Sequence, residues 1–65
     1  MYVVFFSTSD VFEAEEMLNE NNIICKIVPT PVTDKAYCGV CIFTEVEKQK
    51  VEEILEFEYE IVMEV

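Results

Sequence analysis

The sequence has no histidine, no arginine and a single glycine among its 65 residues. Histidine is the side chain that enzymes use most often as a general acid or base, and glycine-rich loops cradle phosphates in many binding sites. Asp and Glu are plentiful, but their helical spacing is typical of solvated surface charge rather than of a catalytic cluster. We therefore expect no hydrolytic or acid/base catalysis and no cofactor. An enzyme is therefore the less favoured interpretation, and a non-catalytic binding module the more favoured one.

Positive charge is also scarce in this chain. Four lysines stand against 14 acidic residues, which gives a formal net charge of −10. Such a charge repels phosphate backbones and anionic lipid alike, so neither nucleic acid nor a membrane surface is an expected partner. The acidic excess is typical of a solvated helix surface that keeps a small apolar domain in solution, and an acidic docking patch is the alternative.

Long hydrophobic runs and a basic N-terminal segment are missing as well. Hydrophobic residues make up 52% of the chain and charged residues 28%, a mixture too apolar for disorder and too often interrupted by charge for a membrane span. The apolar residues after Met1 give way at once to the polar residues 7–10, unlike a secretory signal. Three cysteines, an odd number, do not indicate a disulfide framework. These features predict a cytoplasmic protein with reduced thiols.

Length and hydrophobic periodicity predict one small domain, residues 1–65, with six regular elements. A chain this short buries only about 60% of the surface that its unfolded form exposes, so its stability is marginal. The elements expected in order are a strand over 2–6, a helix from 10 to 21–22, strands over 23–28 and 40–43, a helix opened by residue 44, and a strand over 59–65.

The ends of the two helices carry capping signals. Asp10 with Glu13, and Thr44 with Glu47, have the spacing of N-terminal capping pairs. The pair Asn21-Asn22 suits the end of the first helix, because Asn tolerates the left-handed conformation found there.

The order β-α-β-β-α-β predicts an α+β fold of the ferredoxin-like kind, with a four-stranded antiparallel sheet and two helices on one face. In this topology the first and third strands are central neighbours. Right-handed crossovers then place the loop between the second and third strands at the same end of the sheet as the turn after the first strand. We therefore expect Cys38 close to Ser7, Thr8, Ser9 and Asp10.

The segment Cys38-Gly39-Val40-Cys41 has the spacing of a dithiol or metal motif. In an extended strand, however, residues three apart are separated by about 10 Å and point to opposite faces, whereas a disulfide needs Cα atoms within about 7 Å. The two thiols act together only if Gly39 makes a tight turn. A C-x-x-C metal chaperone is thus the less favoured interpretation, because a tetrahedral zinc site needs two further ligands and Cys25 is expected to face the core.

Cys38 by itself is the better candidate site, because it precedes a strand near a helix N-terminus, whose N–H groups favour an anion such as a thiolate. Lys35 in the same loop favours the thiolate electrostatically, while Asp34 and the overall negative charge oppose it. The alternative, that Cys38 is a small half-buried packing residue, stays open. Cys25 and Cys41 lie inside apolar strand runs, which is typical of packing rather than chemistry.

The loop before Cys38 contains both prolines of the chain. Pro29 and Pro31, on either side of Thr30, hold the backbone extended and remove donors from the sheet, so they end the second strand. Tyr37 either covers the edge of the core or forms an aromatic wall beside the cysteine.

These features occur together in a familiar order: an opening hydrophobic strand, Ser7-Thr8-x-Asp10, Ala14-Glu15, Pro29-Thr30-Pro31, and Cys38-Gly39 at the start of a strand. Over nearly the whole chain the sequence resembles the selenium/sulfur (Se/S) carrier-like family of small bacterial and archaeal domains. The resemblance implies that Cys38 holds sulfur or selenium, as a persulfide or selenylsulfide, and exchanges it with a donor or acceptor protein. Val32 stands where the family often has arginine, which weakens an anion-binding role for the loop, and Cys41 adds a possible resolving thiol.

A different hypothesis is a small interaction module that forms a homodimer or docks on a partner through its sheet. The first two predicted strands carry apolar residues on both faces, so one sheet face is not expected to be left bare to water. The residues concerned are Val3 and Phe5 opposite Val4 and Phe6, and Ile24 and Val28 opposite Ile23 and Ile27.

Overall fold

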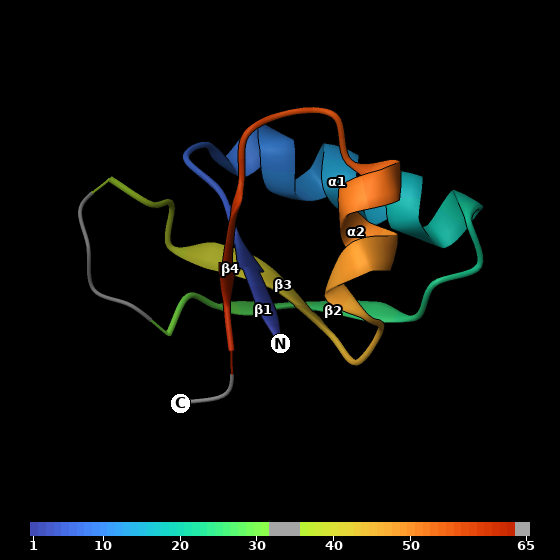
Figure 1. The fold of residues 1–65 in the computed structure, drawn as a ribbon. Coiled ribbons are helices and arrows are strands. Elements are labelled where there is room, and N and C mark those ends of the chain that lie inside the picture. The colour runs from blue at the N-terminus through green and yellow to red at the C-terminus, as the bar shows by residue number, and fades with distance from the viewer. Residues whose placement is uncertain (32–35, 64–65) are drawn as a thin grey trace.

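The computed structural model describes residues 1–31 and 36–63. It contains β1 (Tyr2–Val4), α1 (Thr8–Glu20), β2 (Cys25–Pro29), β3 (Val40–Thr44), α2 (Lys48–Ile54) and β4 (Glu60–Val62). The strands form one antiparallel sheet in the order β2-β3-β1-β4, with β1 and β3 in the centre. Both helices lie on the same side of this sheet (Figure 1). The predicted α+β, ferredoxin-like fold is therefore confirmed.

The core lies between the two helices and one face of the sheet. Val3 of β1 is in register with Ile42 of β3 on one side and with Ile61 of β4 on the other. Residues from this face, from α1 and from α2 form a single buried cluster, which includes Val3, Phe5, Val11, Ala14, Leu18, Ile42, Val51 and Leu55. Since burying one such side chain contributes about 1.5–3 kcal/mol, this cluster is the main source of stability in so short a chain.

The first helix begins earlier than predicted, so the expectation that Asp10 is its cap is wrong. Ser7 is the N-cap, with extended backbone angles (φ −140°, ψ 150°), and its Oγ accepts a hydrogen bond from the Asp10 N–H at 3.3 Å. A serine cap of this kind contributes about 1 kcal/mol. At the other end Asn21 is the C-cap and Asn22 has a φ of 63°, the left-handed conformation predicted for this pair.

The second helix begins later than predicted, because Thr44 is used elsewhere. Thr44 is the last residue of β3 and is only 1% exposed. Its hydroxyl donates to the Ile24 carbonyl at 3.0 Å and accepts from the Val46 N–H at 3.3 Å. A buried hydroxyl needs such partners, so it joins two chain segments instead of capping a helix. Glu47 is the N-cap of α2, without a side-chain cap hydrogen bond.

Three strands also differ from their predicted bounds. β1 ends at Val4 rather than at residue 6, and β2 starts at Cys25 rather than at residue 23 and includes Pro29. β4 covers Glu60–Val62 instead of starting at residue 59, and residues 64–65 of the predicted strand lie outside the described part of the chain. Pro29 is tolerated as the last residue of β2 because β2 is an edge strand. The N–H that proline lacks would point to solvent there, so no hydrogen bond of the sheet is lost. Among the described residues, no helix is long and apolar enough to cross a membrane.

The sheet face away from the helices is partly covered within the single chain. Val4 and Cys41 are fully buried although neither belongs to the core cluster. Tyr2 and Phe43, paired across β1 and β3, are half-buried and bring their rings to a centroid distance of 5.2 Å. The residues at the centre of this face are therefore buried, whereas those toward its margins are partly exposed.

Candidate functional site

Cys38 lies two residues before β3, and its backbone is held from two sides. Its N–H donates to the Phe5 carbonyl at 2.9 Å, and its own carbonyl accepts from the Thr30 hydroxyl at 2.8 Å. The Thr30 N–H in turn donates to the Gly39 carbonyl at 3.0 Å. The end of β1 and the end of β2 thus fix the course of the chain on which the Cys38 thiol sits.

The same contacts bring the β2–β3 connection to the end of the sheet where β1 turns into α1, in agreement with the predicted topology. Phe5, the partner of the Cys38 N–H, is two residues before the cap Ser7. The ring of Phe6 also packs against Tyr37, with centroids 5.2 Å apart. Tyr37 therefore joins the two segments, as an aromatic cover over this end of the sheet.

The other predicted neighbours of Cys38 have identifiable positions. The Ser7 hydroxyl is occupied within the first turn of α1, where it also lies 3.2 Å from Ser9 Oγ. Thr8 is exposed and Asp10 is half-buried in the same turn. Pro31 follows Thr30 and is half-buried. The predicted neighbours Lys35 and Asp34, together with Val32, lie outside the described residues.

The Cys38 thiol is half-buried and packs against the core cluster. Its Sγ donates a hydrogen bond to the Val40 carbonyl at 2.9 Å. Because a carbonyl oxygen only accepts, this contact is made by the protonated thiol. The sulfur must therefore turn away from Val40 before it can act as a nucleophile.

Cys41 lies on the other side of the sheet and is sealed from solvent. It precedes Ile42, a core residue, so its side chain points to the face without helices, where it is 0% exposed. Burial raises the pKa of the Cys41 thiol, the nearby Cys38 adds to this rise, and a hydrogen bond with Thr30 offsets part of it.

Cys25 packs against the core from β2, as predicted, and its Sγ lies 3.8 Å from Asn19 Oδ1. Burial raises the pKa of the Cys25 thiol, and the negative charge of Glu15 adds to the effect. Both terms disfavour the thiolate, the reactive form of cysteine.

Gly39 lies at a bend before β3 but does not use the left-handed conformation that glycine adopts at little cost. A Cβ added to it would meet nothing within 4 Å. The two thiols start on opposite sides of the chain, and all three cysteines are free. Within residues 1–31 and 36–63, no group of three or more Cys, Asp or Glu side chains is arranged to hold a metal ion.

Raised pKa values make the folded state lose stability in alkali. The pKa of the Tyr59 hydroxyl is raised too, by burial first and then by Glu52. A group whose pKa is raised in the folded state keeps its proton at pH values at which the same group in the unfolded chain has lost it. The free energy of unfolding therefore falls as the pH increases. We expect the free energy of unfolding to fall from about pH 8 upward, through the ordinary titration ranges of cysteine and tyrosine. Urea denaturation at a series of pH values measures this.

The matched variants for this pH dependence are Cys25→Ala and Cys41→Ala. Each removes one raised thiol, so the decline in the free energy of unfolding between about pH 8 and pH 10 becomes shallower than in the wild type. If both variants retain the full wild-type slope, the thiols are not its source.

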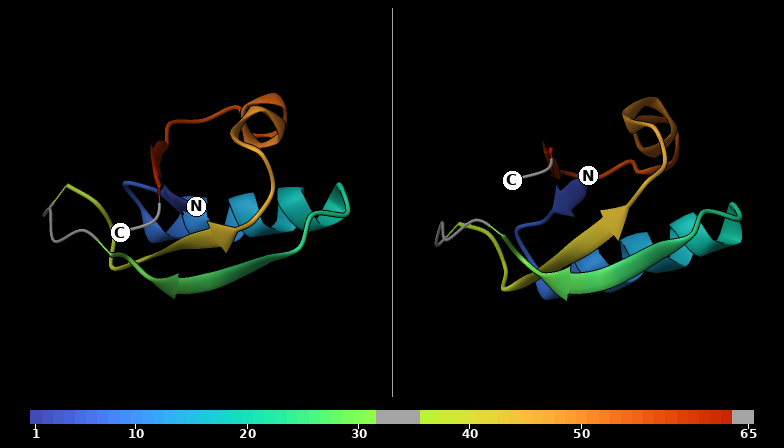
Figure 2. Two further views of the ribbon diagram at one scale, coloured as in Figure 1. Left: turned by 60° about the horizontal axis from the view of Figure 1, so that its bottom comes forward. Right: turned by 90° about the horizontal axis from the view of Figure 1, so that it is seen from below.

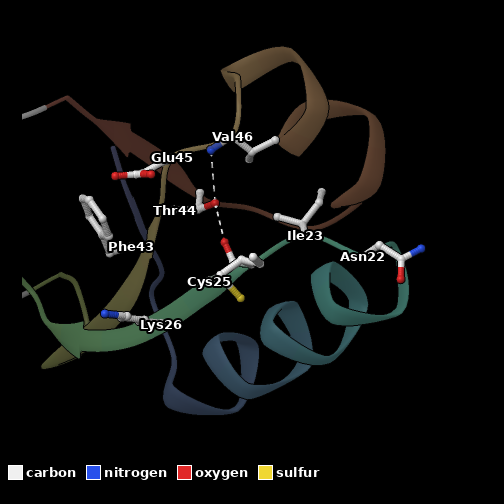
Figure 3. A pocket seen from close by; sticks show the side chains of 9 residues that line it. Asn22, Ile23, Cys25, Lys26, Phe43, Thr44, Glu45 and Val46 are labelled. Carbon is white, nitrogen blue, oxygen red and sulfur yellow. Dashed lines mark hydrogen bonds between the residues drawn. The ribbon is translucent and has the colours of Figure 1, made fainter.

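A groove lies at the opposite end of the sheet from Cys38, and the sequence reasoning missed it. It has a volume of about 460 Å³ and is lined by residues 22–26 and 43–46, at the start of β2 and the end of β3 (Figure 3). Ile24 lines this groove and is 87% exposed, so the signal in the sequence was an apolar residue just before β2. A groove between two segments so far apart in the chain forms only when they pair in register, so the pattern within either segment does not predict it.

Comparison with protein families connects the chain to one of them. A family model described as "Putative Se/S carrier protein-like" matches residues 1–64, nearly the whole chain. The chain belongs to this family. Comparison with curated proteins and with solved structures gives no match. Membership in the Se/S carrier-like family directs attention to the thiols described above, and the family name concerns the transport of sulfur or selenium rather than a turnover reaction.

Proposed function

We propose that this protein is a sulfur or selenium carrier that holds the chalcogen on the thiol of Cys38 and passes it to a partner protein. The observation that carries the proposal is the match of the Se/S carrier-like family over residues 1–64.

Burial disfavours Cys41 as the carrier thiol, and a raised pKa disfavours Cys25. Cys41 is fully buried, and burial raises its pKa. Cys25 is partly buried like Cys38, but burial and then the negative charge of Glu15 raise its pKa. Cys38 is half-exposed in a connection whose backbone is held by Phe5 and Thr30. A thiol on a fixed backbone at the surface suits transfer between proteins, because the partner meets one defined position.

Loading with sulfur is an exchange that consumes no oxidant. The Cys38 sulfur attacks the terminal sulfur of a persulfide on the donor protein. A new S–S bond forms at Cys38, the S–S bond of the donor breaks, and the donor leaves as a thiolate that takes up the proton lost by Cys38. Delivery is the same exchange in reverse, with the thiol of an acceptor protein as the nucleophile.

Selenium enters by exchange with the loaded sulfur. Hydroselenide attacks Sγ of the Cys38 persulfide, an S–Se bond forms, and the terminal sulfur leaves as hydrosulfide. The number of electrons is again conserved, so the protein needs no cofactor for either cargo. The reducing cytoplasm, which keeps thiols free, is the compartment that we propose for this chemistry.

The exposed glycine beside the thiol gives a partner room to approach. Gly39 is exposed, and a Cβ there would contact nothing within this chain, so its lack of a side chain is not required by the fold. A partner backbone can therefore come closer to Cys38 than any larger residue would allow. The Val40 carbonyl, which now accepts from the thiol, is released when the sulfur turns toward the partner.

The test is the intact mass of the protein after incubation with inorganic polysulfide as the sulfur donor. We expect the wild type to gain one sulfur atom, reversibly on addition of dithiothreitol, and Cys38→Ser to gain none. Cys41→Ser is the matched control and keeps the gain, because Cys41 is sealed in the sheet. An adduct that persists in Cys38→Ser, or that disappears in Cys41→Ser alone, contradicts the assignment of the carrier thiol.

A further inference from the structure

Lys26 at the start of β2 is in register with Phe43 near the end of β3, on the sheet face away from the helices. Continued by one residue beyond the pair of Cys25 with Thr44, the same register places Ile24 opposite Glu45, so that these four residues mark the corners of a small square. We call Ile24, Lys26, Phe43 and Glu45 the β2–β3 corner. All four line the groove, and Lys26, Phe43 and Glu45 lie on the same side of the two strands (Figure 3).

Two of the four corner residues, Ile24 and Phe43, are apolar, and the corner is open to solvent in the single chain. Ile24 is 87% exposed, so a large hydrophobic side chain faces water at this corner. Phe43 is half-buried next to Tyr2, and both charged residues are exposed. Within the described residues, neither Lys26 nor Glu45 forms an ion pair.

Charge distinguishes the corner from α1. The chain has a net charge of −10, and α1 carries five of its 14 acidic residues without a single basic one. The corner has one positive and one negative side chain, so it is locally neutral. A basic partner would be drawn to α1, whereas a neutral surface with one charge of each sign fits a copy of itself.

The arrangement of the four residues is self-complementary under a two-fold rotation. Ile24 and Phe43 lie at opposite corners of the square, as do Lys26 and Glu45. If the axis runs along the line from Ile24 to Phe43, each of these two residues meets its own counterpart. Lys26 then faces the Glu45 position of the second chain, and the reverse pair forms at the same time, as expected for an isologous interface.

We propose that the β2–β3 corner binds a second copy of this chain and makes the protein a two-fold symmetric dimer. The acidic helix α1 lies on the other side of the sheet, so it stays outside the interface (Figure 1). The charges of the two copies are then kept apart, and beyond a Debye length of about 8 Å at physiological salt their repulsion is largely screened.

The dimer does not depend on the proposed carrier function and leaves its site open. β2 runs from the corner at its start to Pro29 at its end, so the Cys38 connection lies at the far end of the sheet (Figure 2). Loading of Cys38 and association through the corner can therefore be measured separately, and either can fail without the other.

The first test is sedimentation equilibrium of the reduced protein over about 10–500 μM. We expect a reversible monomer–dimer equilibrium for the wild type and a weakening of at least about tenfold for Ile24→Ser. Phe12→Ser is the matched control, because Phe12 is 54% exposed on α1, outside the corner, and should leave the equilibrium unchanged. A wild-type monomer throughout this range, or a dimer that survives Ile24→Ser, overturns the proposal.

The second test separates pairing at the corner from general repulsion. Glu45→Lys lowers the net negative charge, so it would strengthen association if only overall repulsion mattered. In the proposed dimer it places like charges opposite each other and weakens association, as Lys26→Glu does. The double exchange Lys26→Glu with Glu45→Lys restores both pairs and the original net charge. Recovery of the dimer in the double variant is expected, and a strengthened dimer in Glu45→Lys contradicts the proposal.

Discussion

Replacement of Phe5 by alanine is expected to remove about half of the stability of the protein or more. Phe5 is 0% exposed and is the largest fully buried side chain, with its ring 6.0 Å from that of Phe57 and 6.4 Å from that of Tyr59. Loss of a buried phenylalanine costs about 3–5 kcal/mol. At about 0.05–0.15 kcal/mol per residue, a domain of this length has a total stability of roughly 3–10 kcal/mol. Circular dichroism during heating and urea titration measures the loss.

The adjacent residue provides a matched control for Phe5→Ala. Phe6→Ala removes the same side chain from a position that is 43% exposed and contacts the ring of Tyr37. We expect this variant to remain folded, with a loss of about 1 kcal/mol, since exposed aromatic pairs contribute roughly this amount. Equal losses in the two variants would mean that the core is not organised around Phe5.

The second large effect concerns the reactivity of Cys41, which we expect to be almost inert toward iodoacetamide in the folded protein. Its thiol is fully buried on the face of the sheet without helices, and burial raises its pKa. Alkylation must wait for the sheet to open, and every 1.4 kcal/mol of opening free energy slows the reaction about tenfold. We expect at least about 100-fold slower labelling than in denaturant, from a stability of roughly 3 kcal/mol or more.

This prediction is measured on variants that keep a single thiol. Cys25→Ser with Cys38→Ser leaves only Cys41, and Cys25→Ser with Cys41→Ser leaves only Cys38, which is half-exposed. In the folded state the second variant should be alkylated much faster than the first, while the two should react at similar rates in denaturant. Fast native labelling of Cys41 would mean that β3 separates readily from its neighbours, and it would reopen Cys41 as a carrier thiol.

The order of the elements could be predicted because each leaves its own period in the chain. Alternation marks the strands and helical spacing marks Val11, Ala14 and Leu18, so the fold class follows from the number and sequence of these patterns. The positions of the helix starts could not be predicted in the same way. Ser7 and Asp10 are both good caps in isolation, and only the course of the chain after β1 decides that Ser7 is the cap.

The candidate thiol could be chosen from the sequence, but its surroundings could not. The unusual loop with Pro29, Pro31 and Gly39 identified the segment around Cys38. Its hydrogen bonds go to the backbone of Phe5 and Val40, and backbone partners leave no residue-specific signal in a sequence. The same holds for Thr44, whose hydroxyl is used across the sheet by Ile24 rather than by the helix that follows.

Three properties can be derived from the sequence alone: a small acidic domain, the alternation of two helices with four strands, and a resemblance to a family whose name refers to sulfur and selenium. These properties depend on composition and on local periodicity, which are complete in the chain before it folds. The packed sheet is needed to tell that Cys41 is fully buried while Cys38 is partly exposed, and that Ile24, Lys26, Phe43 and Glu45 lie at one corner. Burial and register are properties of segments distant in sequence that pack together, so they exist only once the sheet has formed.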